Sequence, residues 1–150
     1  NVTLHADWEV PEGIKEVVLD SKAKRVGHGS QIINDISFDN GSITFNTNAA
    51  KYVFDNKIAL EICPTSNVQC GAYSNVSEHS FGELYKAGFN VTINTDNRLM
   101  SDITMSEEVN NVVESFGLVE KDILSITKNT IEAGFVESKL RTGLLEKLDN

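Results

Sequence analysis

Residues 89–100 read FNVTINTDNRLM, an apolar alternation that ends in a cluster of polar residues. Phe89 and Ile93, with the valine between them, would share one face of a strand, because successive side chains of a strand point to opposite faces. Asp96 and Asn97 follow this strand directly. Both residue types are common in turns, so the stretch alone predicts either an ordinary turn or functional groups at the end of a strand.

The same pattern occurs four times along the chain. Short apolar strands alternate with segments of helical periodicity, which predicts an α/β fold with a parallel sheet. The predicted strands are 2–6, 25–29, 58–63 and 89–94. The predicted helices are 11–23, 47–54, 77–87, 106–116, 120–127 and 137–148. Residues 35–46 and the Ser-, Asn- and Gly-rich stretch after Pro64 are predicted to be loops.

Length and composition limit the possible number of domains, partners and cellular locations. The chain has 150 residues, of which 40% are hydrophobic, and we expect residues 1–150 to form a single unit. Its formal charge is −9 and its lysines and arginines are scattered, so a nucleic-acid partner is not expected. No apolar run approaches the ~20 residues of a membrane span, and the first residues lack the pattern of a signal peptide. Cys63 and Cys70 are too few for a disulfide framework, which fits a cytoplasmic location.

Polar residues stand at the ends of all four predicted strands. Functional groups of parallel α/β folds gather at the carboxyl ends of the strands, so His5, His28 and Asp96 are candidates for one convergent site. Imidazole nitrogen and carboxylate oxygen are ligands that zinc accepts. Either histidine alone would be read as a hydrogen-bonded structural residue, but the set of three favours a site. His79, near the start of a predicted helix, is expected to be a solvated or helix-packing residue.

The motifs at the strand ends resemble those of a known family. RVGHG at 25–29, LEICPTSN at 60–67 and INTDNRLM at 93–100, in this order and at these separations, resemble the C-terminal half of the adenosine deaminase family. The last motif matches the bacterial form with Asn-Thr-Asp-Asn, and HAD at 5–7 stands where the family has His-Ala-Gly-Glu. The resemblance implies a zinc-dependent TIM-type (β/α)8 barrel of the amidohydrolase type. It also implies hydrolysis of adenosine or deoxyadenosine to the inosine product and ammonia.

The resemblance assigns roles residue by residue. His5 and Asp96 resemble zinc ligands, and His28 resembles the histidine that orients and deprotonates the zinc-bound water. Asn97 stands where the family often has an aspartate that hydrogen-bonds purine N7. N7 is an acceptor, and an amide NH₂ can donate to it without the protonation that a carboxyl group would need. A small purine nucleoside is therefore the expected ligand.

The chain departs from the family pattern at the catalytic glutamate. The family has this glutamate three residues after its histidine, where this chain has Trp8, and Glu9 follows one residue later. A shift of one residue turns a strand side chain to the other face, so Glu9 could act as the proton shuttle only through a local bulge. Asp7 replaces the family's glycine at the preceding position.

The chain also supplies only about four of the eight βα units of a complete barrel, which takes ~250 residues. We therefore expect it to need an N-terminal barrel half, or a second copy of itself, as a partner. Two alternatives stay open at this point. The first is a non-catalytic purine-binding or structural relative, and the second is an amidohydrolase that acts on another aminated heterocycle.

Overall fold

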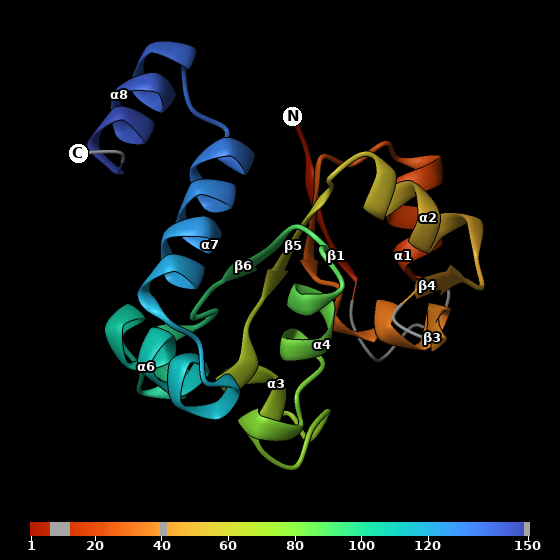
Figure 1. Ribbon diagram of the computed structural model, residues 1–150, viewed down its shortest axis with the longest axis horizontal. Helices are drawn as coiled ribbons and strands as arrows, with labels where there is room; N and C mark the ends of the chain where they lie inside the picture. Colours follow the sequence, from red (N-terminus) through yellow and green to blue (C-terminus); the bar gives the residue numbers. More distant parts are fainter. Residues whose placement is uncertain (7–12, 40–41, 149–150) are drawn as a thin grey trace.

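A four-stranded parallel sheet forms the centre of the protein (Figure 1). The structure, a computed structural model, describes residues 1–6, 13–39 and 42–148. The strands are β1 (Thr3–Ala6), β2 (Arg25–His28), β5 (Ala59–Ile62) and β6 (Val91–Ile93), in the order β1-β2-β5-β6. The α/β class and the side-by-side arrangement of the four predicted strands are thus confirmed.

The register of the sheet brings the carboxyl ends of its strands to one edge. Ala6 pairs with His28 between β1 and β2, and Ile62 pairs with Ile93 between β5 and β6. Gly27 of β2 pairs with His5 of β1 on one side and with Glu61 of β5 on the other. The segments that follow the strands therefore emerge together, and they carry the candidate site.

Helices flank the sheet on both sides in Figure 1, with α2 toward one end of the molecule and α6 and α7 toward the other. The longer helices are α2 (Asn48–Asp55), α6 (Met105–Phe116), α7 (Glu120–Ala133) and α8 (Ser138–Leu148). The shorter ones are α1 (Gly13–Lys15), α3 (Pro64–Gln69), α4 (Phe81–Lys86) and α5 (Arg98–Ser101). A π-helical turn, η1 (Glu16–Asp20), and two 3-10 turns, η2 (Ser30–Asp35) and η3 (Val76–Glu78), complete the helical segments. None of the helices in these described ranges combines the length and hydropathy of a membrane span.

The ends of the helices follow ordinary capping chemistry. The Thr47 side chain accepts a hydrogen bond from the Ala50 amide at the start of α2, at 3.1 Å. Thr104 and Glu107 form a capping box at the start of α6. Gly88, just beyond the end of α4, has a positive φ of 87°, the left-handed conformation in which many helices end.

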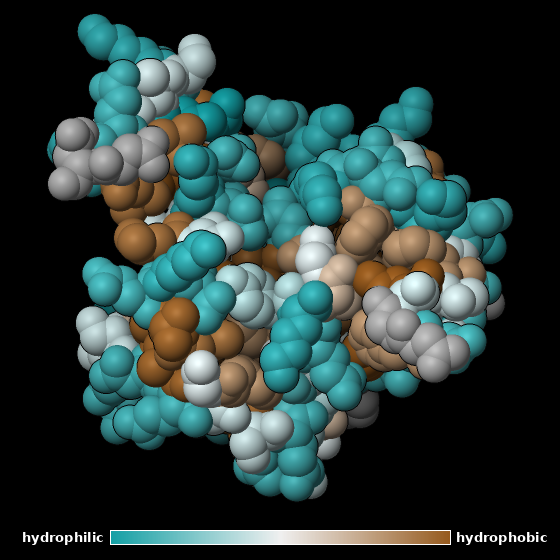
Figure 2. Space-filling view, in the orientation of Figure 1, coloured by the Kyte–Doolittle hydropathy of each residue, from teal (hydrophilic) through white to brown (hydrophobic). Residues whose placement is uncertain are grey.

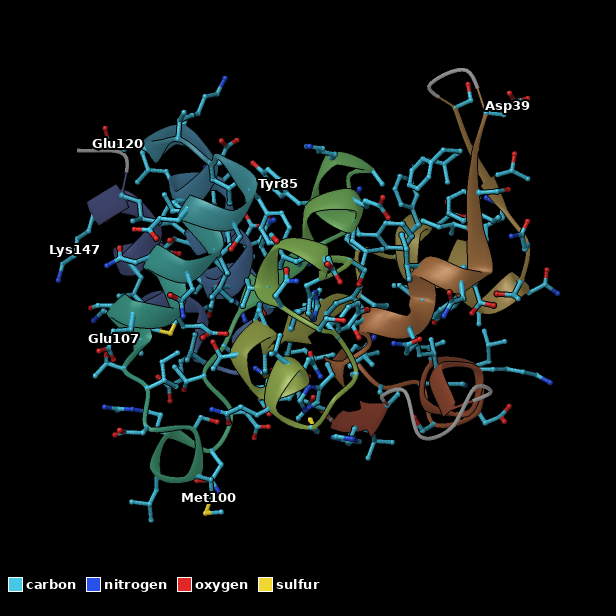
Figure 3. The ribbon with its side chains drawn as sticks, turned by 90° about the horizontal axis from the view of Figure 1, so that it is seen from below. Asp39, Tyr85, Met100, Glu107, Glu120 and Lys147 are labelled. Atoms are coloured by element: carbon cyan, nitrogen blue, oxygen red, sulfur yellow. The ribbon has the colours of Figure 1, made fainter. Side chains whose placement is uncertain are left out.

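The hydrophobic core lies between the sheet and these helices. Its fully buried members come from every layer and include Val26, Leu60, Ile62 and Val91 from the strands, and Phe81, Leu84 and Val112 from the helices. Tyr85 ties α4 to α7, because its hydroxyl donates to the Asp122 carboxylate at 2.8 Å (Figure 3). The burial of these side chains fixes the sheet on its helical layer and thereby positions the strand ends.

The predicted loop at residues 35–46 is wrong, because residues 36–39 and 42–45 form two paired strands. Strands β3 (Ile36–Asp39) and β4 (Ser42–Phe45) pair antiparallel, and Asp39 lies at the tip of the hairpin (Figure 3). The Phe45 ring packs against Phe54 and Phe89, with centroids 5.2 and 6.5 Å apart. Tertiary packing of this aromatic group outweighs the turn-rich composition of the segment.

Three helical predictions also need correction. The first part of the stretch predicted as a loop after Pro64 forms helix α3, with the proline in its first turn, whereas residues 70–75 are a loop as predicted. The predicted helix 77–87 is split into η3 and α4, and the Asn75 side chain caps the first part. In its described part, the predicted helix 11–23 is helical over residues 13–20, as α1 and the π-helical turn η1, and residues 21–23 are not helical.

Candidate active site at the carboxyl ends of the strands

Three side chains predicted from the sequence meet at one edge of the sheet. His28 Nε2 lies 3.7 Å from Asp96 Oδ2, and the His5 and His28 rings meet edge-on with centroids 4.8 Å apart. All three residues line a cleft of about 360 Å³, together with Cys63 and Asn94. The separation of His28 and Asp96 exceeds a direct hydrogen bond, but both groups can reach one small ligand between them.

The backbone is unusual at two of these residues. His28 has φ 60° and Asp96 has φ 55°, both in the left-handed region that non-glycine residues rarely adopt. Gly29 follows with φ 70°, and a Cβ atom there would lie 2.8 Å from a methyl group of Leu60. For residues other than glycine, such conformations cost of order 1–3 kcal/mol each and cluster at functional sites. The two residues with this conformation, His28 and Asp96, are the pair whose side chains meet in the cleft.

Helix α3 holds Asp96 in place. The Ser66 hydroxyl donates to Asp96 Oδ2 at 2.8 Å. The preceding residue, Thr65, donates its backbone amide (2.9 Å) and its hydroxyl to the Glu108 carboxylate, which is fully buried. Glu108 belongs to α6, so a long-range contact anchors the first turn of the helix that orients Asp96.

The next residue of α3 holds His28. Asn67 is fully buried, its Nδ2 lies 3.2 Å from His28 Nδ1, and its Oδ1 lies 3.1 Å from His79 Nε2. His79 Nδ1 in turn accepts the Phe81 backbone N–H at 3.0 Å. Burial, with a smaller effect of the nearby His28, lowers the pKa of His79 from 6.5 to about 4. Of the two expectations for His79, the solvated residue is wrong, because the side chain is buried and belongs to a chain of hydrogen bonds.

The metal-binding capacity of the site differs from the pair predicted from the sequence. In the described part of the chain, one group of three residues can offer ligand atoms within 4.8 Å of one another: His28, Cys63 and Asp96. The Cys63 thiol donates to the Glu61 carbonyl at 3.3 Å. His5 is outside this group, although it lines the same cleft. Nitrogen, oxygen and sulfur donors at one edge fit zinc.

Two predicted residues remain to be located. Asn97 is exposed and is the N-cap of α5, where its side-chain oxygen accepts from the Met100 amide at 3.3 Å. Met100 itself points away from the body of the protein (Figure 3). Glu9, with its neighbours Asp7 and Trp8, lies outside the described residues.

The sequence pattern missed the residues that support the site. Ser66, Asn67 and Glu108 were assigned no role, although the first two follow a buried strand just as Asp96 does. That position after a strand is the signal by which Ser66 and Asn67 could have been found. Glu108 carries no such signal, because its partner is 43 residues away.

Comparisons with known proteins agree with this architecture. The profile of the Adenosine deaminase family matches residues 1–150. An adenosine deaminase of Mycobacterium bovis is 40% identical over 149 residues, which are 97% of this chain and 40% of the relative. The structure of the N6-methyl-AMP deaminase of Arabidopsis thaliana matches with a TM-score of 0.79 and 26% identity, over 99% of this chain and 40% of that one. A Burkholderia ambifaria amidohydrolase with bound Zn matches with a TM-score of 0.79 and 19% identity, over 98% of this chain and 39% of that one. The chain thus spans about 40% of the length of these relatives.

Proposed function

Because this chain belongs to the adenosine deaminase family, we propose that it is the C-terminal half of a zinc-dependent enzyme that deaminates adenosine and deoxyadenosine. Water replaces the 6-amino group of the purine, which gives inosine or deoxyinosine, and ammonia leaves. The observation that carries the proposal is the meeting of His28 and Asp96, 3.7 Å apart, at the carboxyl ends of parallel strands. In barrels of this kind that edge is where chemistry occurs.

The donor set at this edge supports a zinc ion as cofactor. His5 and Asp96 would hold the ion, and the Ser66 hydroxyl keeps Asp96 oriented toward the cleft. A structural relative contains zinc. Zinc bound there would act as a Lewis acid that lowers the pKa of a bound water toward neutrality.

The other residues would handle the substrate and its protons. His28 would hold the attacking water beside purine C6, and the Asn97 amide would donate to N7. Glu9 would protonate N1 if a bulge brings it to the site. The two cysteines, one buried and one exposed, support a cytoplasmic location for the enzyme.

We propose further that activity requires the remainder of the barrel, supplied by an N-terminal half or by a second copy of the chain. Leu4 on the outer strand β1 is 38% exposed, and an edge strand with exposed apolar side chains can pair with a strand of another chain. Apolar residues are also exposed where α7 meets α8, namely Phe135, Val136 and Leu140, and Figure 2 shows brown surface in this region. We refer to this chain together with the remainder of the barrel as the completed enzyme.

Ammonia release by the completed enzyme tests the proposal. The substrate panel is adenosine, deoxyadenosine, adenine, AMP and N6-methyl-AMP, with bound metal measured on the same sample. Preference for adenosine and deoxyadenosine is the expected result. Release from another member of the panel would identify a related amidohydrolase, and purine binding without release by metal-loaded protein would identify a non-catalytic relative.

A further inference from the structure

We propose that Asn67 and His79 are positioning residues that hold His28 in one tautomer, with its hydrogen on Nε2, the nitrogen that faces Asp96. The proposal rests on the proposed function, because it concerns the residue that would hold the attacking water. Neither Asn67 nor His79 lines the cleft that contains His28 and Asp96. Both therefore act through His28 and not on the substrate.

The direction of the hydrogen bonds is set by a backbone amide. The Phe81 N–H can only donate, and it points at His79 Nδ1 at 3.0 Å. His79 Nδ1 must therefore be the acceptor, which leaves the hydrogen of the neutral ring on Nε2. That nitrogen lies 3.1 Å from Asn67 Oδ1 and donates to it.

The same logic extends through Asn67 to His28. Since the amide oxygen of Asn67 faces His79, its NH₂ group faces His28 Nδ1, at 3.2 Å. An NH₂ group only donates, so His28 Nδ1 is an acceptor and the hydrogen of the neutral His28 ring lies on Nε2. A fixed backbone donor thus determines the protonated nitrogen of His28 through two intervening side chains.

Burial protects this chain of hydrogen bonds from reversal. His79 is 2% exposed, Asn67 is fully buried, and the Tyr73 ring covers His79 with centroids 4.0 Å apart. Protonated His79 would carry hydrogens on both nitrogens, and one of them would oppose the Phe81 N–H. The low pKa of His79, about 4, keeps the ring neutral near pH 7.

The tautomer decides what His28 offers to the cleft. With its hydrogen on Nε2, His28 is a donor toward the space it shares with Asp96 and holds an oxygen there by donation. With its hydrogen on Nδ1, the ring would present a lone pair instead. Of the two roles that the resemblance allows for His28, holding the water is the one that this tautomer serves.

The sharpest test reverses one hydrogen bond without changing the shape of the side chain. In Asn67→Asp, the group that faces His28 Nδ1 becomes an acceptor, so Nδ1 has to carry a hydrogen. Long-range ¹H–¹⁵N correlation spectra of the completed enzyme, labelled at histidine, report which ring nitrogen of His28 is protonated. We expect hydrogen on Nε2 in the wild type and on Nδ1 in the variant. We also expect kcat for adenosine to fall about 10- to 100-fold, with KM changed much less.

A matched control comes from the opposite end of the sheet. Asn90 donates its amide to the Lys57 carbonyl at 2.8 Å, away from the cleft. Asn90→Asp introduces the same charge and loses the same kind of donor. We expect the spectrum of His28 and the kcat of this variant to match the wild type.

A second pair of variants covers the case in which Asn67→Asp does not fold. His79→Gln keeps an NH₂ donor for Asn67 Oδ1, whereas His79→Leu removes it. If the chain of hydrogen bonds positions His28, the Gln variant retains the Nε2 hydrogen and most of kcat. The Leu variant loses both, at equal metal content.

The outcomes separate this proposal from the proposed function. An unchanged His28 spectrum in both Asn67→Asp and His79→Leu would overturn the positioning role. A wild-type enzyme that binds metal but releases no ammonia would refute the deaminase function and still leave the spectra to test the tautomer. Equal loss of kcat in His79→Gln and His79→Leu, with the His28 spectrum unchanged in both, would also overturn the positioning role.

Discussion

The buried His79 makes the stability of the protein depend on pH in a defined window. Its pKa is lowered from 6.5 to about 4, first by burial and then by the nearby His28. The unfolded chain therefore binds a proton that the folded chain does not bind between these two pH values. Stability is greatest above pH 6.5 and is lost as the pH falls toward 4.

The size of the effect follows from the two pKa values. A lowering from 6.5 to about 4 corresponds to about 3 kcal/mol of unfolding free energy, once the pH lies below both values. Between pH 7.5 and pH 5 the loss is about 2 kcal/mol. The full difference applies because the side chain is only 2% exposed, so solvent does not screen it appreciably.

The assay is urea unfolding of wild type and His79→Gln in the completed enzyme, at pH 7.5 and at pH 5. Glutamine does not titrate, so the variant reports the pH dependence of all other groups. We expect the variant to be less stable at pH 7.5 and the gap to shrink by about 2 kcal/mol at pH 5. If both proteins lost stability in parallel, His79 would titrate normally in the fold, and the buried chain of hydrogen bonds would be wrong.

Further changes test the ligand, substrate and anchoring roles. Asp96→Ala should abolish deamination and lower bound zinc, whereas full activity would remove Asp96 from the ligand set. Asn97→Ala should weaken purine binding by roughly 1–3 kcal/mol while kcat changes less. Asn97→Asp keeps the helix cap, so a similar loss of purine affinity in that variant would show that the missing N7 donor is the cause. Glu108→Ala should cost about 1–3 kcal/mol of stability, because it removes the acceptor of two partly buried donors of Thr65, and Glu108→Gln should cost less. Dialysis of the 150-residue chain alone should remove zinc, since only His5 and Asp96 are proposed as direct ligands; stoichiometric retention would show that further residues complete the shell.

The sheet and the meeting of His28 with Asp96 could be predicted because both depend on local signals. A buried parallel strand is a short apolar run, and the polar residues that follow it must emerge at one edge. Neither inference requires knowledge of a distant partner. The strand at 58–63 and the polar cluster at Asp96 were therefore recognisable from sequence alone.

The segments that were mispredicted depend on distant contacts. Helix α3 has a Ser- and Asn-containing sequence that by itself favours a loop, and its first turn is held by Glu108, which lies in another helix. The β3–β4 hairpin is held by Phe45 against the rings of Phe54 and Phe89. His79 lies between η3 and α4, where the predicted helix is broken, and it is buried against the Tyr73 ring and Asn67. Propensities computed over a short window contain none of these interactions.

Helix α3 links the fold to the site through three consecutive residues. Thr65 bonds to Glu108, Ser66 bonds to Asp96, and Asn67 bonds to His28. Since a helix of six residues has too few internal hydrogen bonds to be rigid alone, its orientation depends on the buried carboxylate of α6. Glu108 therefore helps to orient both the Asp96 carboxylate and the His28 imidazole in the cleft. His28 and Asp96 both have strained left-handed backbone conformations, and their contacts with α3 help to stabilise these conformations in the folded state.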